Sequence, residues 1–245
     1  MGKKLVIILF VLVLMTSCTG PAGQQGPAGP QGPAGPEKPG IYYIRIFQNG
    51  VYSSTYTGQV ESCLFGNSPM PYYTDNTVPI NLGVKNSLGR YRAILKFDIS
   101  SLPNSKIIVD KAELTIKTTP NNYGGGARDV TIHKVISPWK VFETGWQVRQ
   151  LTPDWKNWQN DGGDYDANTI TPKSATIDIL ANSTITIELD PKVVQGWMEN
   201  PATNYGIILR VINETQLNNY AEIYPGGASN PENRPKLKIW YYTVE

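Results

Sequence analysis

Hydrophobic and polar residues alternate along most of the chain after residue 40, as they do in strands that bury one face. The alternation is clearest in four segments, whose apolar positions are Tyr91, Ala93, Leu95 and Phe97; Ala112, Leu114 and Ile116; Ile185, Ile187 and Leu189; and Leu237, Ile239 and Tyr241. The run 205–212 is apolar at both odd and even positions apart from Arg210, which predicts a central strand that is buried on both faces. Turn residues separate these runs, as in Pro225-Gly226-Gly227. Many short strands joined by turns predict an antiparallel β-sandwich or barrel.

One helix is expected among the strands. Asp190 is a good N-cap residue and Pro191 suits the first helical position. Asn200-Pro201 ends the apolar periodicity, because proline cannot continue a helix. We expect this short helix to close one end of the sandwich, with Trp197 packed inward.

The longest irregular segment runs from Thr152 to Lys173. Loops of this length in a compact domain are usually functional or anchored. Its acidic residues are Asp161, Asp164 and Asp166, with Gly162 and Gly163 between them. Calcium prefers carboxylate and carbonyl oxygens, so a structural calcium ion on the three aspartates is one prediction. An ordinary solvated turn is the alternative.

The chain begins with a basic and then an apolar segment. Lys3 and Lys4 precede the unbroken apolar run from Leu5 to Met15, which is too short to span a bilayer and suits the core of a secretory signal. Thr16-Ser17-Cys18 follows and resembles a bacterial lipobox. We therefore expect residues 1–17 to be a lipoprotein signal peptide and Cys18 to be lipidated. The protein would then be exported and anchored to a membrane at the cell envelope or cell surface.

Residues 18–40 form a low-complexity stem with six Gly-x-y triplets, from Gly20 to Glu37. Glycine at every third position is what a collagen triple helix requires. Two alternatives stay open: a homotrimer held by a collagen-like stem, or a single polyproline II stalk roughly 60 Å long. In both, the stem carries a head formed by residues 41–245.

Net charge and cysteine content limit the classes of binding partner and the disulfides that the sequence supports. The formal charge is +2, with 22 basic and 20 acidic residues, and loss of Lys3 and Lys4 with the signal leaves 20 of each. A neutral chain gives no argument for a nucleic-acid partner, and none is expected. With Cys18 lipidated, Cys63 has no partner within the chain, and we expect it to be a small buried apolar residue.

Motifs of catalysis are missing from the sequence. It contains no His-Glu-x-x-His, no Gly-x-Ser-x-Gly and no phosphate-binding glycine loop. The one histidine, His133, is expected to point to solvent from a strand. We therefore expect no enzyme. A polysaccharide-degrading enzyme is kept as a third alternative, because its carboxylate pair would meet in space rather than in sequence.

Several segments together resemble the DNRLRE-domain family. They are Arg92-Ala93-Ile94-Leu95-Lys96-Phe97-Asp98, Leu102-Pro103, Ala112-Glu113-Leu114, Trp139, Thr144-Gly145-Trp146, Gly162-Gly163-Asp164-Tyr165, Leu189-Asp190, Trp197 and Arg234-Pro235-Lys236-Leu237 with Tyr241. The resemblance covers nearly all of residues 55–242. Glu61 stands where the family pattern has Asp, and the stretch from Ser68 to Asp75 looks inserted. The resemblance implies a jelly-roll-type β-sandwich that is not catalytic, in a family that includes alginate-type carbohydrate-binding modules.

The resulting hypothesis is a cell-envelope lipoprotein whose head binds a polysaccharide or cell-surface glycan, with an acidic polysaccharide favoured. Aromatic rings would stack on sugars, and basic side chains would meet carboxylates. The candidate residues, outward by alternation or in the long loop, are Arg92, Lys96, Trp155, Trp158, Tyr165 and Trp240. The main alternative is a structural or adhesion module, trimerised by the stem, with no glycan ligand.

Overall fold

The computed structural model describes residues 40–51, 55–73, 75–86, 89–103, 106–120, 127–171, 175–178 and 183–243. The predicted signal peptide, the predicted lipidation site Cys18 and the Gly-x-y triplets lie outside these residues. The described residues thus belong to the predicted head and to the glycine that immediately precedes it.

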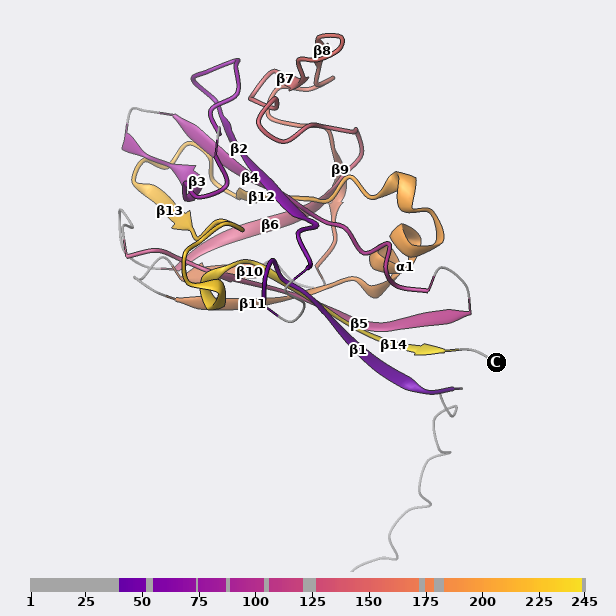
Figure 1. Ribbon diagram of the computed structural model, residues 1–245. Coiled ribbons are helices and arrows are strands. Elements are labelled where there is room, and N and C mark those ends of the chain that lie inside the picture. Colours follow the sequence, from indigo (N-terminus) through magenta and orange to yellow (C-terminus); the bar gives the residue numbers. More distant parts are fainter. Residues whose placement is uncertain are drawn as a thin grey trace, which may run out of the picture. The chain divides into compact units, whose positions relative to one another are not determined.

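The head consists of antiparallel strands in two facing sheets (Figure 1). The strands are β1 (Tyr42–Phe47), β2 (Gln59–Phe65), β3 (Ile80–Val84), β4 (Arg90–Phe97), β5 (Ile107–Lys117), β6 (Ala127–Val135), β7 (Val148–Gln150), β8 (Lys156–Asn157), β9 (Tyr165–Thr169), β10 (Ala175–Asp178), β11 (Thr184–Leu189), β12 (Ile207–Val211), β13 (Asn219–Ile223) and β14 (Lys236–Thr243). The pairings between them are antiparallel throughout the described residues. The predicted all-β antiparallel sandwich is confirmed.

The two sheets differ in size. The four-stranded sheet has the order β1-β14-β5-β11, and the eight-stranded sheet has the order β10-β6-β12-β4-β3-β13, with β2 paired to β4 and β9 paired to β6. Strand β12 lies between β6 and β4, which confirms the central strand predicted from the run 205–212. Strands β7 and β8 form a small separate pair.

The main core lies between the two sheets and uses the apolar positions that the alternation predicts. Strand β4 contributes Ala93, Leu95 and Phe97, β5 contributes Ala112, Leu114 and Ile116, and β14 contributes Leu237, Ile239 and Tyr241. Each fully buried Leu or Ile side chain contributes about 1.5–3 kcal/mol. A one-residue slip of any of these strands would expose its whole set, so the core fixes the register. Cys63 is free and fully buried in this core, as expected.

The predicted helix is confirmed as α1 (Pro191–Glu199). The Asp190 side chain accepts a hydrogen bond from the Lys192 amide, 2.9 Å away, and the backbone amide of Asn200 closes the last turn on the Gly196 carbonyl. Trp197 is buried in the main core. Two short 3-10 helices, Pro201–Thr203 and Pro231–Asn233, complete the regular structure described.

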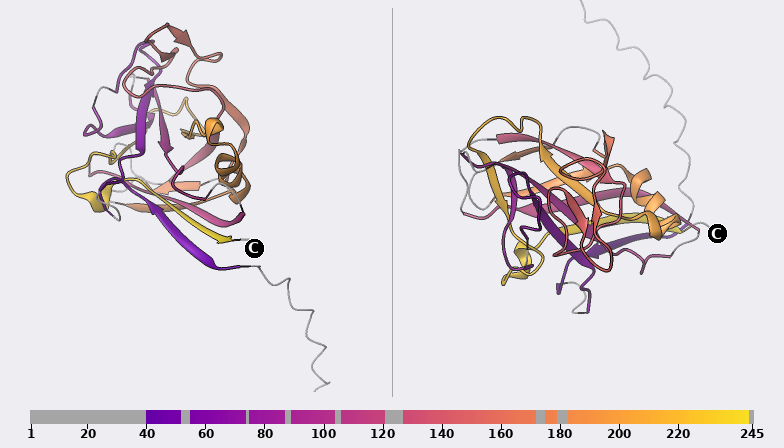
Figure 2. Two further views of the ribbon diagram at one scale, coloured as in Figure 1. Left: turned by 45° about the vertical axis from the view of Figure 1, so that its right-hand side comes forward. Right: turned by 90° about the horizontal axis from the view of Figure 1, so that it is seen from above.

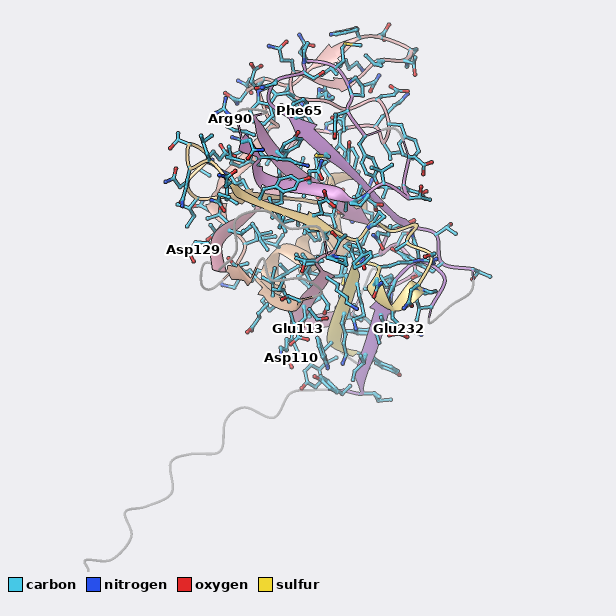
Figure 3. All side chains as sticks on the ribbon, turned by 90° about the vertical axis from the view of Figure 1, so that its left-hand side faces the viewer. Phe65, Arg90, Asp110, Glu113, Asp129 and Glu232 are labelled. Atoms are coloured by element: carbon cyan, nitrogen blue, oxygen red, sulfur yellow. The ribbon has the colours of Figure 1, made fainter. Side chains whose placement is uncertain are left out.

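Residues 136–164, which include β7 and β8 and which we call the covering segment, provide much of the apolar packing on the outer face of the eight-stranded sheet. A second apolar cluster forms there, from Leu64, Ile94, Val135, Trp146, Trp158 and Ile208. In Figure 3, Phe65 and Arg90 mark the eight-stranded sheet, and Asp110 and Glu113 mark β5 of the four-stranded sheet below it. The eight-stranded sheet is therefore buried on both faces where this cluster forms.

Candidate functional site

The six predicted ligand-binding side chains lie in separate regions of the head. Three of them lie at or beneath the covering segment: Arg92, Trp158 and Tyr165. The other three are a half-buried side chain on β4, an exposed ring just before β8 and a partly exposed ring on β14: Lys96, Trp155 and Trp240. The structure therefore does not bring the predicted set together in one site.

Arg92 is buried, so the expectation that it faces solvent is wrong. Its side chain does leave the core face, as the alternation indicates, but the covering segment leaves only 6% of the residue exposed. Nη1 donates to the Gly162 carbonyl at 2.8 Å, and Nε and Nη2 donate to the Glu214 carboxylate at 2.7 and 2.8 Å. The guanidinium carbon also lies 4.8 Å from the centre of the Trp146 ring. Arg92 therefore joins the covering segment and Glu214 to the sheet.

The charges around Glu214 reinforce one another. Burial alone raises the pKa of this carboxyl, but the hydrogen bond and charge of Arg92, with the charges of Arg210 and Arg90, outweigh burial and lower the pKa from its usual value. Burial lowers the pKa of Arg92, and Glu214 raises it by more. Both groups are thus held in their charged forms.

The aromatic candidates nearest Arg92 are also engaged within the fold. Trp158 is buried, which corrects its expected exposure in the loop, and its Nε1 donates to the Gly145 carbonyl at 3.0 Å. The Tyr165 hydroxyl, on a half-buried side chain, accepts a hydrogen bond from Arg210 Nη1 at 2.7 Å. These two rings stabilise the covering segment and its surroundings.

His133 is buried, which corrects the expectation that it points to solvent. Its Nδ1 lies 2.9 Å from the Asp166 carbonyl, and its ring lies 4.8 Å from the Tyr165 ring. Burial lowers the pKa of the imidazole below its ordinary value, against the effect of the Asp166 carbonyl. Strand β9, which pairs with β6 at this residue, supplies the cover that the alternation could not indicate.

The three aspartates of the predicted calcium site all accept hydrogen bonds. Asp164 is buried, and its carboxylate accepts from the Ser137 hydroxyl at 2.8 Å and from the amides of Gln159 and Asn160 at 3.0 and 2.8 Å. Asp161 accepts from a glutamine side chain, and Asp166 accepts from the amide of residue 168. Within the described part of the chain, no three His, Cys, Asp or Glu side chains form a group suited to a metal ion. Calcium at this loop stays a prediction.

Trp155 is the most exposed of the aromatic candidates, with 57% of the residue accessible. It lies in the turn between β7 and β8, and its Nε1 donates to the Asn157 side chain at 2.6 Å. Among the described residues, no aromatic ring and no cation stacks on the Trp155 ring. Trp155 offers one stacking surface on this turn. The basic residues of the same β7–β8 pair are Lys156, which is exposed, and Arg149, which donates hydrogen bonds to the Asn157 and Pro138 carbonyls.

Trp240 has the surroundings that the hypothesis requires. Its ring lies on the outer face of the four-stranded sheet, opposite Lys111 on β5 and two residues after Lys238 on the same strand. The Nζ atoms of Lys238 and Lys111 lie 4.4 and 5.2 Å from the centre of the ring. We call Lys111, Lys236, Lys238 and Trp240 the basic aromatic face. Cations this close to an indole ring are attracted to it and are held in place.

The charge balance of the outer face is basic. The partly or fully exposed positions of β5, β11 and β14 carry four lysines, Lys111, Lys117, Lys236 and Lys238, against three acids, Asp110, Glu113 and Glu188. Glu113 pairs with Lys111 at 2.6 Å, which raises the pKa of that lysine. Among the described residues, Lys236 and Lys238 make no ion pair. The Lys238 ammonium group, next to the indole, and the Lys236 ammonium group, four residues before Trp240 on β14, therefore remain available to an anionic ligand.

Sequence reasoning missed Lys111 and Lys238 as site residues. Lys238 shares the parity of Trp240 on one strand, so its place beside the ring could have been found from the alternation. Lys111 belongs to β5, and a bulge in the β5–β14 pairing follows Trp240. The position of Lys111 beside the ring therefore depends on the register between the two strands, which the sequence alone does not give.

A cleft of about 610 Å³ lies elsewhere, between β5, β14 and α1. Its lining is mostly apolar and includes the carboxylates of Asp110, Asp190 and Glu199 against one lysine, Lys192. This charge opposes an acidic glycan, so the basic aromatic face is the better candidate for one.

No known protein family and no curated protein matches this chain at a significant level. Within the described residues, the helices are too short to cross a bilayer.

Proposed function

We propose that the head binds an acidic polysaccharide, without cleaving it, through the basic aromatic face. The observation that carries the proposal is the closeness of the partly exposed Trp240 ring to the ammonium groups of Lys238 and Lys111, which lie 4.4 and 5.2 Å from its centre on the outer face of the four-stranded sheet. An indole ring provides an apolar platform for the face of a sugar ring. Lys238, which makes no ion pair among the described residues, provides positive charge for a uronate carboxylate beside the ring, and Lys236 extends this charge along β14.

The flatness of the surface favours a polymer over a small molecule. Small ligands are usually enclosed in concave pockets, whereas the basic aromatic face is formed by neighbouring outward side chains of two adjacent strands. An extended chain lying across β14 and β5 would contact several of these side chains at once. The resemblance to the DNRLRE-domain family, with its carbohydrate-binding members, agrees with this mode of binding.

Binding without cleavage is supported by the place of the carboxyl group whose pKa burial raises. Perturbed carboxyl groups are typical of catalytic sites when they line a cleft that substrate can enter. Burial raises the pKa of Glu61, but this residue is only 1% exposed and its carboxylate accepts hydrogen bonds from Tyr73, Gly226 and Gln59. Glu61 is therefore a structural acid in this proposal.

The head would act at the cell envelope, held there by lipid on Cys18 and by the Gly-x-y stem. The sequence Thr16-Ser17-Cys18 after the apolar run supports this part of the proposal. Labelling with a fatty-acid analogue should mark the wild-type protein and should leave Cys18→Ala unmarked. Equal labelling of the two would rule out lipidation at Cys18.

The binding test is calorimetry with alginate, polygalacturonate and a neutral glucan. We expect the two acidic polymers to bind and the neutral one to bind far more weakly. A hydrogen bond to a charged group contributes about 1.5–3 kcal/mol, so Lys238→Ala should weaken binding roughly tenfold or more. Added salt should weaken the binding of the acidic polymers to the wild type, because exposed charges are screened. Trp240→Ala should remove most of the affinity.

Trp155→Ala is the matched control, because it removes an exposed tryptophan far from the basic residues of the face. It should bind like the wild type. If Trp155→Ala loses binding while Trp240→Ala keeps it, the site belongs at the β7–β8 turn. If neither acidic polymer binds, the head is better described as a structural or adhesion module.

A further inference from the structure

Four connections between strands meet at a second cavity, which shares no lining residue with the basic aromatic face. They join β1 to β2, β2 to β3, β6 to β7 and β13 to β14, and the first and last of them lie side by side (Figure 2). The cavity has a volume of about 340 Å³, in the range of pockets that hold small ligands. We call it the loop cavity. Its lining includes Asn49, Thr57, Gln59, Glu61, Asn76, Phe142 and Arg234.

Hydrogen bonds between these connections hold the walls of the loop cavity. Arg234 Nη1 donates to the Asn49 carbonyl at 2.7 Å. The Asn49 side chain accepts from the Gln59 amide and donates to the Gln59 carbonyl, both at 3.1 Å. The Gly227 amide donates to the Asn76 carbonyl at 2.9 Å. The cavity is thus formed before a ligand arrives, which lowers the cost of ordering it on binding.

Gln59 contributes a buried acceptor to the wall. The residue is 3% exposed, and its Nε2 donates to the Glu61 carboxylate at 3.1 Å. Its Oε1 has no hydrogen-bond partner among the described residues. A Cβ at Gly226 would lie 2.6 Å from Gln59 Nε2, so glycine is needed where this turn packs on the amide. Buried polar groups nearly always have a partner, and a ligand in the loop cavity can supply the donor that Oε1 lacks.

Phe142 contributes an aromatic ring from a strained backbone position. Its φ is +64°, and it is the third residue of a turn closed by a hydrogen bond from the Glu143 amide to the Lys140 carbonyl at 3.2 Å. A positive φ at this position favours glycine or asparagine. The residue is 41% exposed, and its ring stacks on that of Tyr73 with centroids 6.1 Å apart. Strained residues cluster at ligand sites, and an exposed ring held in this way offers a platform for a sugar.

The polar lining favours a neutral ligand. One acid and one base line the loop cavity, Glu61 and Arg234, and both are hydrogen-bonded within the fold. The other polar side chains are amides and hydroxyls, which can each donate and accept. The hydroxyl groups of a neutral sugar match such a lining. A uronate would instead bring its carboxylate towards Glu61.

We infer that the loop cavity binds a neutral sugar ring, either free or at the end of a glycan chain. The ring of Phe142 packs against the apolar face of the sugar, and a sugar hydroxyl donates to Gln59 Oε1. A concave site of this size suits a single ring, whereas the flat basic aromatic face suits a polymer. A neutral glucan has few chain ends for its mass, so the weak binding expected for that polymer is unchanged. This inference goes beyond the binding of an acidic polysaccharide and does not depend on it.

The test is titration by ligand-observed NMR of the full-length protein, in a detergent without a sugar headgroup. The ligands are glucose, galactose, mannose and N-acetylglucosamine, and at least one of them should bind. Phe142→Gly should weaken that binding roughly fivefold or more, because the stacking ring is lost. Glycine suits the left-handed backbone at this position, so the variant should remain folded, which circular dichroism checks. Asn76→Ala, at an exposed part of the lining, should also weaken binding.

Asn218→Gly is the matched control. Asn218 also has a left-handed backbone, with a φ of +60°, and it lies in the connection between β12 and β13, outside the lining of the loop cavity. This variant should bind the sugar like the wild type.

Trp240→Ala separates the loop cavity from the basic aromatic face. It should lose the acidic polymers and keep the neutral sugar, and in this variant glucuronate should bind more weakly than that sugar. The inference is overturned if none of the four neutral sugars binds, if Phe142→Gly binds like the wild type, or if Trp240→Ala loses the sugar. A failure of the acidic polymers alone leaves it intact.

Discussion

Arg92 and Glu214 form a bidentate ion pair at the outer face of the eight-stranded sheet, with both side chains less than a tenth exposed. Arg210 adds a third hydrogen bond to the same carboxylate at 3.3 Å. A pair of this kind does not by itself prove high stability, because removing two charges from water is costly. Removing one partner is a different matter, since the other charge is left buried and uncompensated.

We expect Arg92→Met to lower the free energy of unfolding by about 3–5 kcal/mol, the usual cost of breaking a buried ion pair. Urea denaturation at pH 7 measures the change. Lys156→Met, at an exposed position of β8, is the control and should stay within about 0.5 kcal/mol of the wild type. A loss of less than 1 kcal/mol in Arg92→Met would mean that the covering segment does not depend on this contact.

The same pair makes stability depend on pH at the acid side. The folded-state pKa of Glu214 is lowered, so its contribution is present above the unfolded-state pKa and is lost as the pH falls through the folded-state pKa. Glu214→Gln lacks this group. The stability difference between the wild type and Glu214→Gln should therefore shrink steadily below pH 4, and a constant difference would contradict the assignment.

Glu61 should give the opposite pH dependence. Burial raises its folded-state pKa, despite hydrogen bonds from Gly226, Tyr73 and Gln59, so the protein loses stability as the pH rises from the unfolded-state pKa through the folded-state one. Each unit of difference between the two pKa values corresponds to about 1.4 kcal/mol. The Gln59 Oε1 atom has no hydrogen-bond partner among the described residues, so a turned Gln59 amide can accept from a glutamine at position 61.

We therefore expect Glu61→Gln to gain stability relative to the wild type as the pH is raised from 4.5 to 8. Urea denaturation at several pH values measures the difference. Glu232→Gln, on a partly exposed surface turn, is the control and should track the wild type. A Glu61→Gln curve parallel to that of the wild type would show that the buried carboxyl does not titrate in this range.

Two glycines test the backbone of the fold in opposite directions. Gly206, before β12, has a φ of +85°, and a Cβ there would lie 2.1 Å from the Leu95 carbonyl oxygen. The left-handed conformation alone costs an L-residue about 1–2 kcal/mol, so Gly206→Ala should lose at least about 2 kcal/mol. Gly196 lies inside α1 with no atom within 4 Å of the added Cβ, so Gly196→Ala should gain up to about 1 kcal/mol. Thermal denaturation of both variants tests these opposite changes in stability, and equal shifts in the melting temperature of the two variants would contradict the prediction.

The sequence predicts much of the fold because strand periodicity states which side chains leave the core. It correctly separates Arg92 from Ala93, and Trp240 from Ile239. What covers the outer face is a different question, because Trp146 and Trp158 of the covering segment follow no period. Arg92 and His133 are buried because segments distant in sequence pack against their strands, whereas Trp158 belongs to the covering segment and is buried because it packs onto the sheet.

The candidate site was predicted only in part, for a related reason. Trp240 was identified by its parity on one strand, but its most informative neighbour, Lys111, belongs to a strand more than a hundred residues earlier. The pairing of β5 with β14 also contains a bulge after Trp240, which changes the parity of the following pairs. Register between distant strands is set by packing of the whole core, so the pair could be found only from the structure.

The acidic loop provides the last test, because two explanations of Asp164 differ in their dependence on metal. The Asp164 carboxylate accepts hydrogen bonds from Ser137, Gln159 and Asn160. Asp164→Ala leaves these donors unpaired, so we expect the free energy of unfolding to fall by about 1–3 kcal/mol for each donor that finds no new partner. This loss should be the same in calcium and in chelator.

A calcium ion on Asp161, Asp164 and Asp166 would instead raise the melting temperature of the wild type as calcium is added, because it binds only the folded state. Asp161→Ala, an exposed position, then separates the two: it should be nearly neutral if the loop is held by hydrogen bonds alone, and it should abolish the calcium-dependent rise if the ion is bound.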